Sequence, residues 1–301
     1  MTLPHRVQIC EMGPRDGLQN EVAIVASADK VRYIDMLSQA GLPLIEATSF
    51  VSSKAIPQLS DAAQVYSTIE KRAGVRYLVL VPNLKGLERA RIAGVDSIAV
   101  FTAASETFTK KNINMTIAGS LALFEEVVHA ASSLGMWVRG YVSTCFGCPY
   151  EGPVAVSKVL EVSRALDKIG VDEISLGDTI GVGVPTQVFE TVAALREHMP
   201  VEKLALHLHD TRGTALANVL AGLQSGVSIF DSSAGGLGGC PYAPGASGNL
   251  GTEDLLYMLH GMGIETGVDI SKVRDASRFI AGVLQHDLSS KVYSVMEKQP
   301  A

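Results

Sequence analysis

The sequence predicts a single α/β domain over residues 1–301 that folds as a closed (β/α)8 barrel with the TIM-barrel architecture. The main observation is a repeat, in which an amphipathic stretch ends in glycine and a short run rich in Val, Ile and Leu follows. About eight such units are present, and strands that alternate with helices form a parallel sheet. No linker-like stretch interrupts the units, which favours a closed barrel over the alternative, a doubly wound open sheet.

Each element of the repeat has a physical reason. A glycine that ends a helix adopts positive φ without strain, and such glycines are expected at positions 41, 74, 94, 135, 170 and 226. The apolar runs show little alternation, which is typical of strands buried on both faces. Strands are expected at runs that include 7–12, 42–50, 172–178 and 204–209, and a helical tail at about 268–301.

Composition and charge exclude several classes of partner. The chain is 47% hydrophobic and 19% charged, and its net charge is -6 with no basic run, so we expect it to bind neither nucleic acid nor a membrane surface. No apolar segment approaches membrane-spanning length. We expect no targeting leader, because the N-terminus runs almost directly into the first strand, and four cysteines are too few for a disulfide framework. We therefore expect a cytoplasmic protein.

Polar side chains follow several of the predicted strands, at the end of a barrel where active sites lie. From the first strand to the eighth, these are Arg15 and Asp16, then Glu46, then Asp178, then His207 and His209, and finally a glycine-rich loop over about 232–251.

The two histidines of LALHLHD are expected to project to the same face of a strand, because side chains at i and i+2 do so. Leu206 and Leu208 would then face the helices, and His207 and His209 the barrel interior. Two converging imidazoles predict a divalent metal site. Two separately hydrogen-bonded core histidines are the alternative.

Other residues could complete this site. Asp16 would supply a carboxylate, although R-D-G is also a good turn sequence, and Asn249 would supply an amide oxygen. A set of nitrogen and oxygen donors favours Mg²⁺ or Mn²⁺ over zinc. Arg15 would stabilise a developing enolate, unless it is an ordinary surface arginine. Glu46 in a buried strand needs a partner, and Arg15 is the nearest choice.

The glycine-rich loop 232–251 has the composition of a hinged lid. Cys240 lies in its middle, where a thiol is expected to be reactive. Cys10 is expected in a buried strand, whereas Cys145 and Cys148 lack the second pair that a zinc site needs. Neither a dinucleotide-binding glycine motif nor a phosphate-binding P-loop is present.

These motifs identify a resemblance. The chain is similar, over nearly its whole length, to the 3-hydroxy-3-methylglutaryl-CoA lyase family, within the superfamily of metal-dependent lyases and Claisen-condensing barrels. The most specific stretches are EMGPRDGLQNE, GYVSTCFGCPYEG, HLHDTRGTALAN and GGLGGCPYAPGASGNLGTED. The resemblance implies cleavage of 3-hydroxy-3-methylglutaryl-CoA to acetyl-CoA and acetoacetate by a bacterial, cytoplasmic homodimer.

The resemblance also implies a role for each candidate residue. The metal ligands would be Asp16, His207, His209 and Asn249, of which Asp16 and His207 would also belong to the catalytic group. Arg15 would stabilise the enolate and Glu46 would hold Arg15. Cys240 would transfer a proton and Asp178 would support the network beside the metal. A loop of Lys110, Lys111 and Asn112 would lie near the phosphates of the acyl-CoA substrate.

Four alternatives remain open at this point. The closest are a lyase for a longer 3-hydroxy-3-alkylglutaryl-CoA and a related Claisen-condensing synthase, which would share the arginine, the aspartate and the H-x-H pair. A non-haem iron oxygenase also uses two histidines and a carboxylate. A non-catalytic protein that binds CoA or a metal is the fourth.

Overall fold

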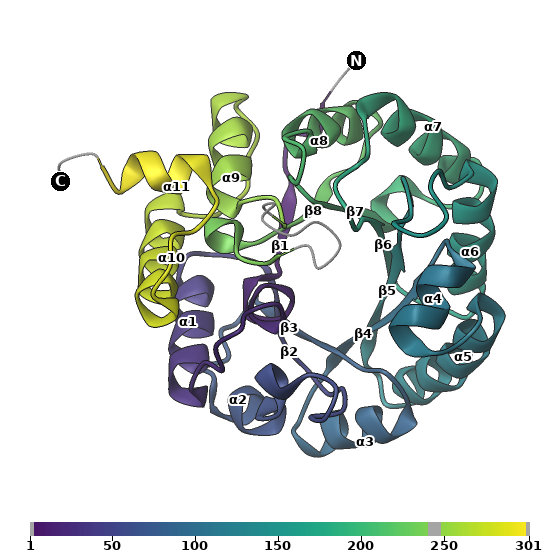
Figure 1. Cartoon of the computed structure of the whole chain (residues 1–301), viewed down its shortest axis with the longest axis horizontal. Coiled ribbons are helices and arrows are strands. Elements are labelled where there is room, and N and C mark those ends of the chain that lie inside the picture. Colours follow the sequence, from purple (N-terminus) through teal and green to yellow (C-terminus); the bar gives the residue numbers. More distant parts are fainter. Residues whose placement is uncertain (1–2, 240–247, 299–301) are drawn as a thin grey trace.

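The predicted barrel is confirmed by a computed structural model, which describes residues 3–239 and 248–298. Over these residues, parallel strands pair in sequence order and β8 returns to pair with β1 (Figure 1). The strands are β1 (Gln8–Glu11), β2 (Leu44–Ser49), β3 (Arg76–Leu80), β4 (Ser97–Ala103), β5 (Trp137–Ser143), β6 (Glu173–Asp178), β7 (Leu204–Leu208) and β8 (Ile229–Ser232).

Helices surround the barrel, as Figure 1 shows. The helices that follow the strands are α1 (Ser27–Gln39), α2 (Ala62–Thr68), α3 (Leu84–Ile92), α4 (Glu106–Ile113), α5 (Ile117–Ser133), α6 (Val156–Lys168), α7 (Pro185–Arg196), α8 (Ala215–Gln224) and α9 (Thr252–Gly261). The expected tail contains α10 (Ile270–Leu284) and α11 (Lys291–Met296), and α10 packs between α9 and α1. None of the helices in the described part of the chain has the length and apolar character needed to cross a membrane.

Short helical turns occur in four of the connections. They are η1 (Gly13–Gly17), η2 (Pro57–Leu59), η3 (Val201–Lys203) and η4 (Ala234–Gly236). Two of them, η1 and η4, follow β1 and β8 directly and so begin the connections at the carboxyl ends of neighbouring strands. The candidate site is built around these two turns and the end of β7.

The helix-ending glycines behave as predicted. The six positions named from the sequence have φ between 71° and 94°, a region that glycine enters without strain. At Gly41 space is also limiting, because a Cβ atom there would lie 2.6 Å from the carbonyl oxygen of Gly267.

The barrel interior contains an apolar cluster and a charged cluster. The small apolar cluster comes from β1 to β5 and the residue just after β1, and its members are Cys10, Met12, Leu44, Leu78, Leu80, Ala99 and Tyr141. This confirms the prediction that Cys10 lies in a buried strand. The side near β5 to β8 instead carries Arg139, Glu173, Asp231 and His207. A larger apolar core joins the outer faces of the strands to the helices.

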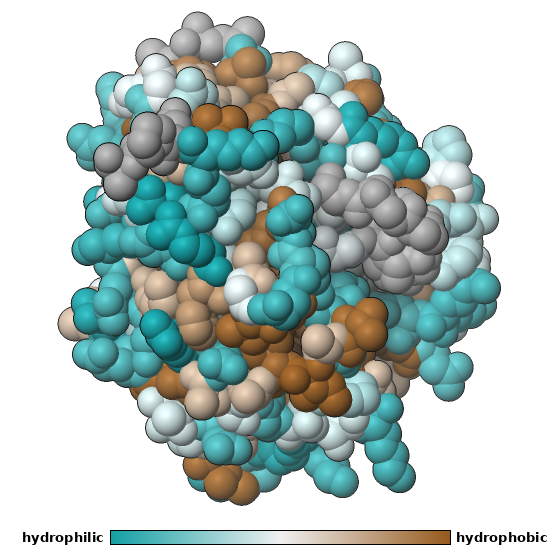
Figure 2. Space-filling view, turned by 60° about the vertical axis from the view of Figure 1, so that its left-hand side comes forward, coloured by the Kyte–Doolittle hydropathy of each residue, from teal (hydrophilic) through white to brown (hydrophobic). Residues whose placement is uncertain are grey.

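On the face drawn in Figure 2, hydrophilic side chains predominate toward the edges and hydrophobic ones gather in the lower centre.

Candidate active site

A cavity of about 480 Å³ lies at the ends of the strands where the sequence placed the candidate residues. Its wall includes the polar residues Arg15, Asp16, Ser175, His207 and His209. It also includes the apolar residues Leu80, Phe101, Phe108, Ile113 and Phe124, from β3, β4 and the helices α4 and α5. The cavity therefore offers both charged and apolar groups to a ligand.

Three predicted metal ligands meet in the cavity wall. One donor atom from each of Asp16, His207 and His209 lies within 4.8 Å of the others. The Nε2 atoms of the two histidines are 3.1 Å apart, as expected for side chains on one face of a strand. Leu206 and Leu208 pack into the outer core, which confirms the predicted direction of each side chain.

The charge states of two of these donors suit a cation, whereas the pKa of His207 is raised because Asp231 and Asp16 outweigh the lowering by burial. Burial and the neighbouring His207 lower the pKa of His209 to about 3, so its imidazole is neutral at pH 7. Burial alone would raise the pKa of Asp16, but Arg15 and the two histidines lower it to about 2. A carboxylate anion and a neutral imidazole are the forms that coordinate a metal. The donor set therefore fits a divalent cation that prefers oxygen and nitrogen ligands.

The turn η1 positions two of the candidates. The backbone N–H groups of Asp16 and Gly17 both donate to the carbonyl of Met12, which forms a π-helical turn rather than the simple turn that R-D-G suggested. This turn brings Arg15 and Asp16 to the cavity wall. Asp16 is therefore more than a turn residue.

Arg15 and Glu46 form the pair that the sequence predicted. The Nε of Arg15 donates to Glu46 Oε2 at 2.5 Å, and its Nη1 donates to Asp16 Oδ1 at 2.7 Å. Burial lowers the pKa of Arg15, but the two carboxylates raise it by a larger amount, so the guanidinium stays charged. Arg15 is 8% exposed and lines the cavity, which rules out an ordinary surface arginine.

Asn249 lies beside the same group. It forms a β-bridge with His209, and its Nδ2 donates to Asp16 Oδ2 at 2.8 Å and to the carbonyl of Leu237 at 3.2 Å. Its role as a ligand stays a prediction.

Asp178 lies at the end of β6 and holds the loop that follows this strand. Its two carboxylate oxygens accept hydrogen bonds from the backbone N–H groups of Val182 and Gly183, at 3.0 and 2.9 Å. Neither of these two partners is a metal-site residue. Support of the network beside the metal stays a prediction, and the geometry shows a loop-holding contact.

The prediction of a loop at Lys110, Lys111 and Asn112 is wrong, because these residues lie in α4. Ser105 caps the helix by accepting from the backbone N–H of Phe108, and the polar composition of this segment concealed the helix in the sequence. Asn112 lines the cavity, whereas both lysines are exposed and Lys111 Nζ lies 4.5 Å from the centre of the Tyr150 ring.

The predicted lid is described only at its two ends, and Cys240 lies outside the described residues. At the first end, the backbone N–H groups of Ala234 and Gly235 donate to the buried carboxylates of Glu11 and Glu253. At the other end, the backbone N–H of Thr252 donates to the carbonyl of Ser233. Buried hydrogen bonds therefore hold both ends of this segment together.

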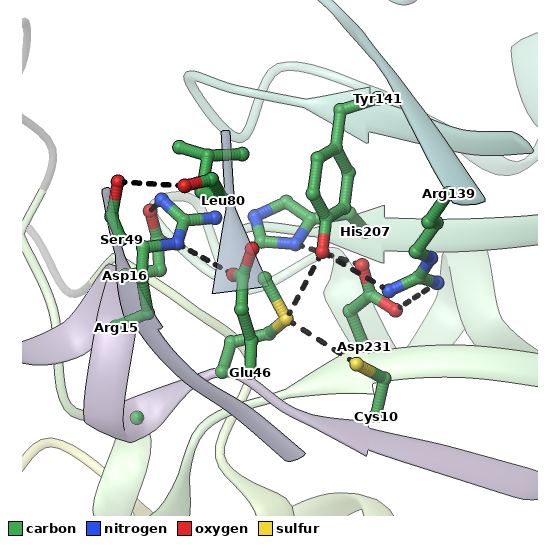
Figure 3. A network of polar contacts seen from close by, with 12 residues as sticks. Cys10, Arg15, Asp16, Glu46, Ser49, Leu80, Arg139, Tyr141, His207 and Asp231 are labelled. Atoms are coloured by element: carbon green, nitrogen blue, oxygen red, sulfur yellow. Dashed lines mark hydrogen bonds and ion pairs between the residues drawn. The ribbon is translucent and has the colours of Figure 1, made fainter. Parts of the chain in front are cut away.

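Sequence reasoning missed the charged group beneath the cavity. Arg139 and Asp231 are buried in β5 and β8 and joined by an ion pair of 2.6 Å, and Figure 3 shows His207 beside them. The available signal was a charged residue inside each of the apolar runs WVRGYVS and VSIFDSS, because buried charges require partners. Tyr141, which lines the cavity, was missed because an aromatic residue in a strand is common.

The comparisons with known proteins agree with one another. The HMGL-like family model matches residues 6–280. The mitochondrial hydroxymethylglutaryl-CoA lyase of Gallus gallus is 55% identical over 96% of this chain and 97% of its own length. The cytoplasmic 3-hydroxy-3-methylglutaryl-CoA lyase of Rattus norvegicus is 53% identical over 96% of this chain and 84% of its own length.

Solved structures give the same result. The hydroxymethylglutaryl-CoA lyase of Pseudomonas aeruginosa has a TM-score of 0.97 and 48% identity, and the match covers 99% of both chains. An HMG-CoA lyase from Acinetobacter baumannii, solved with coenzyme A and 3-methylmalate, has a TM-score of 0.93 and 39% identity, and the match covers 100% of this chain and 99% of that one.

Proposed function

The chain belongs to the HMGL-like family, and from this premise we propose that it is a hydroxymethylglutaryl-CoA lyase, which cleaves 3-hydroxy-3-methylglutaryl-CoA to acetyl-CoA and acetoacetate. The observation that carries this function is the meeting of Arg15 with Asp16, His207 and His209 in one cavity. A cation site beside a fixed guanidinium is what a retro-Claisen cleavage requires.

We propose that a divalent cation, Mg²⁺ or Mn²⁺, is held by Asp16, His207 and His209, with Asn249 as a further ligand. When bound, it supplies Lewis acidity that favours loss of the proton from the C3 hydroxyl of the substrate. Support comes from the donor set, which among the described residues contains one carboxylate and two imidazoles within 4.8 Å and no sulfur.

The reaction breaks the C2–C3 bond and leaves its electron pair on the thioester, as an enolate. Arg15 is proposed to stabilise this negative charge, because its guanidinium remains cationic at the cavity wall. Glu46 orients Arg15 through the hydrogen bond to Nε. Cys240 is proposed to donate the proton that converts the enolate to acetyl-CoA.

The apolar residues of the cavity wall support an acyl-CoA as the substrate, and Asn112 in α4 also lies on this wall. The related protein from A. baumannii was solved with coenzyme A. Lys110 and Lys111 are proposed to approach the CoA phosphates from the exposed side of α4. A homodimer and a cytoplasmic location are also proposed, and the relatives include both mitochondrial and cytoplasmic proteins.

Product analysis tests this function. Purified protein with Mg²⁺ is incubated with a series of 3-hydroxy-3-alkylglutaryl-CoA esters. We expect acetyl-CoA and acetoacetate from the methyl ester at the highest kcat/KM. A higher kcat/KM for a longer alkyl group would assign the enzyme to the longer substrate. Consumption of acetyl-CoA with a 2-oxo acid, without cleavage of any ester, would assign it to the condensing enzymes.

A further inference from the structure

Asp231 lies beneath the metal-site histidines and contacts one of them directly. It is 1% exposed, and it stands opposite His207 in the register of β7 and β8. His207 Nδ1 lies 3.2 Å from Asp231 Oδ2, and the hydroxyl of Ser175 donates to the same oxygen at 2.9 Å. Arg139 Nη2 donates to the other oxygen, Oδ1, at 2.6 Å (Figure 3).

These contacts determine which nitrogen of His207 carries a proton. Asp231 sits between a guanidinium and a hydroxyl that both donate to it, so its carboxylate acts as an acceptor. His207 Nδ1 must then be the N–H donor, because a bond between two acceptors is not stable. The neutral ring therefore keeps its lone pair on Nε2, the atom that faces His209 and Asp16.

His209 provides an internal contrast. Its Nδ1 is buried and has no hydrogen-bond partner among the described residues. No carboxylate of the described chain therefore sets its tautomer, although it belongs to the same group of three donors. Of the two histidines, His207 is the one whose orientation is determined by the strand next to it.

Arg139 holds Asp231 in place. Its Nε lies 2.7 Å from Glu173 Oε1, and its Nη1 donates to the hydroxyl of Tyr141 at 3.3 Å. Glu173 stands opposite Arg139 in the register of β5 and β6, so this cluster joins three neighbouring strands to β5 across the interior. These contacts fix the orientation of the Asp231 carboxylate, so that Oδ1 faces Arg139 and Oδ2 faces His207.

We propose that Asp231 is a positioning residue that holds His207 in the Nδ1–H tautomer and presents Nε2 to the divalent cation. This proposal rests on the proposed function, which places a cation at Asp16, His207 and His209. Carboxylates in this position orient metal-bound histidines in many proteins, and their loss typically weakens metal affinity about 10- to 100-fold.

The variant Asp231→Asn tests this tautomer without changing the size of the side chain. Its amide oxygen should turn to Arg139, which can only donate, so its NH₂ group should face His207. His207 Nδ1 would then accept, and the proton would move to Nε2. We expect Mn²⁺ affinity, measured by electron paramagnetic resonance in the absence of substrate, to fall about 10- to 100-fold.

Glu173→Gln is the matched control. It removes one negative charge from the same arginine but leaves the contact of Asp231 with His207 intact. We expect its Mn²⁺ affinity to stay within about threefold of the wild-type value if the effect is specific to the histidine. Equal losses in both variants would overturn the positioning role and assign the cluster to structure alone.

Nitrogen-15 NMR of histidine side chains in the metal-free wild-type protein reads the tautomer directly and needs no variant. The Nδ1–H form at His207 supports the proposal, and the Nε2–H form overturns it. Mn²⁺ binding by the wild type separately tests the metal part of the proposed function. A wild type that shows the Nδ1–H form but binds no cation would therefore contradict the proposed function and not the tautomer.

Discussion

Two buried arginines lie inside this barrel, and each forms ion pairs with two carboxylates. Arg15 pairs with Glu46 and Asp16 at the wall of the cavity. Arg139 pairs with Glu173 and Asp231 below the cavity. Arg15 is 8% exposed, whereas Arg139 is 0% exposed and does not line the cavity.

The two clusters differ in whether their charged groups face the cavity. The Arg15 cluster faces the cavity, so under the proposed function its positive charge can respond to charge that develops during the reaction. The Arg139 cluster is enclosed by neighbouring strands and reaches the cavity wall through its contacts with His207, Ser175 and Tyr141. The same pairing of charges therefore lines the cavity at one level of the barrel and is enclosed at the next.

Removal of metal should produce the largest effect. This effect should be confined to the cavity, where the Arg15 cluster lies. After treatment with EDTA we expect activity to be abolished, because Asp16, His207 and His209 then have no cation to hold. Addition of Mg²⁺ or Mn²⁺ should restore it, and circular dichroism should show an intact fold throughout. Full activity in metal-free protein would contradict the metal site.

Arg15→Gln should produce the next largest effect. We expect kcat to fall by about a hundred- to a thousandfold or more, because the stabilised charge exists only near the transition state. KM should change little, and steady-state kinetics separate the two constants. An unchanged kcat with a raised KM would show that Arg15 only binds the substrate.

Arg139→Met should affect stability most among the charge substitutions. It leaves Glu173 and Asp231 buried without their cation, and loss of one partner of a buried pair costs about 3–5 kcal/mol. The free energy of unfolding in urea measures this loss. As a control, neutralising both carboxylates in the same protein, with Glu173→Gln and Asp231→Asn, should recover part of it. A decrease of less than about 1 kcal/mol in the free energy of unfolding would mean that Glu173 and Asp231 do not require Arg139 for stable burial.

His209 should add a smaller dependence of stability on pH in the metal-free protein. Its pKa is about 3 in the folded state, against an ordinary value of 6.5, so the unfolded chain binds the proton first as the pH falls. The contribution of His209 to the free energy of unfolding is therefore fully present above pH 6.5. Below pH 6.5 this contribution is lost, by up to about 1.4 kcal/mol per pH unit. Urea unfolding between about pH 7 and pH 5 measures this loss.

His209→Asn should flatten this pH profile, with the exposed His129→Asn as the control for replacing a histidine. The opposite sign is expected at His207, whose pKa is raised because Asp231 outweighs the effect of burial. Its contribution is present below pH 6.5 and is lost at higher pH, so the two histidines act in separate windows. An unchanged slope below pH 6.5 in His209→Asn would mean that other groups carry the dependence.

Rules that depend only on neighbouring residues in the chain were sufficient to predict much of the fold and part of the site. The alternation of strands and helices, the glycines with positive φ and the shared direction of His207 and His209 depend on neighbouring residues in the chain. The same rules failed at α4, where a polar segment forms a helix because Ser105 caps it and Phe108 packs below. Tertiary contacts decide such a segment, so composition alone did not predict it.

What the sequence determined by itself is therefore the order of the elements, the side of each strand that its residues face, and the family to which its motifs belong. Only the tertiary structure decided which buried charges meet. Arg139 and Asp231 are 92 residues apart, and His207 and Asp231 are 24 apart. The physical reason is that closing the barrel sets the register between strands, and register is a property of the whole sheet. Each strand alone specifies a direction for its charges, and the neighbouring strands supply their partners.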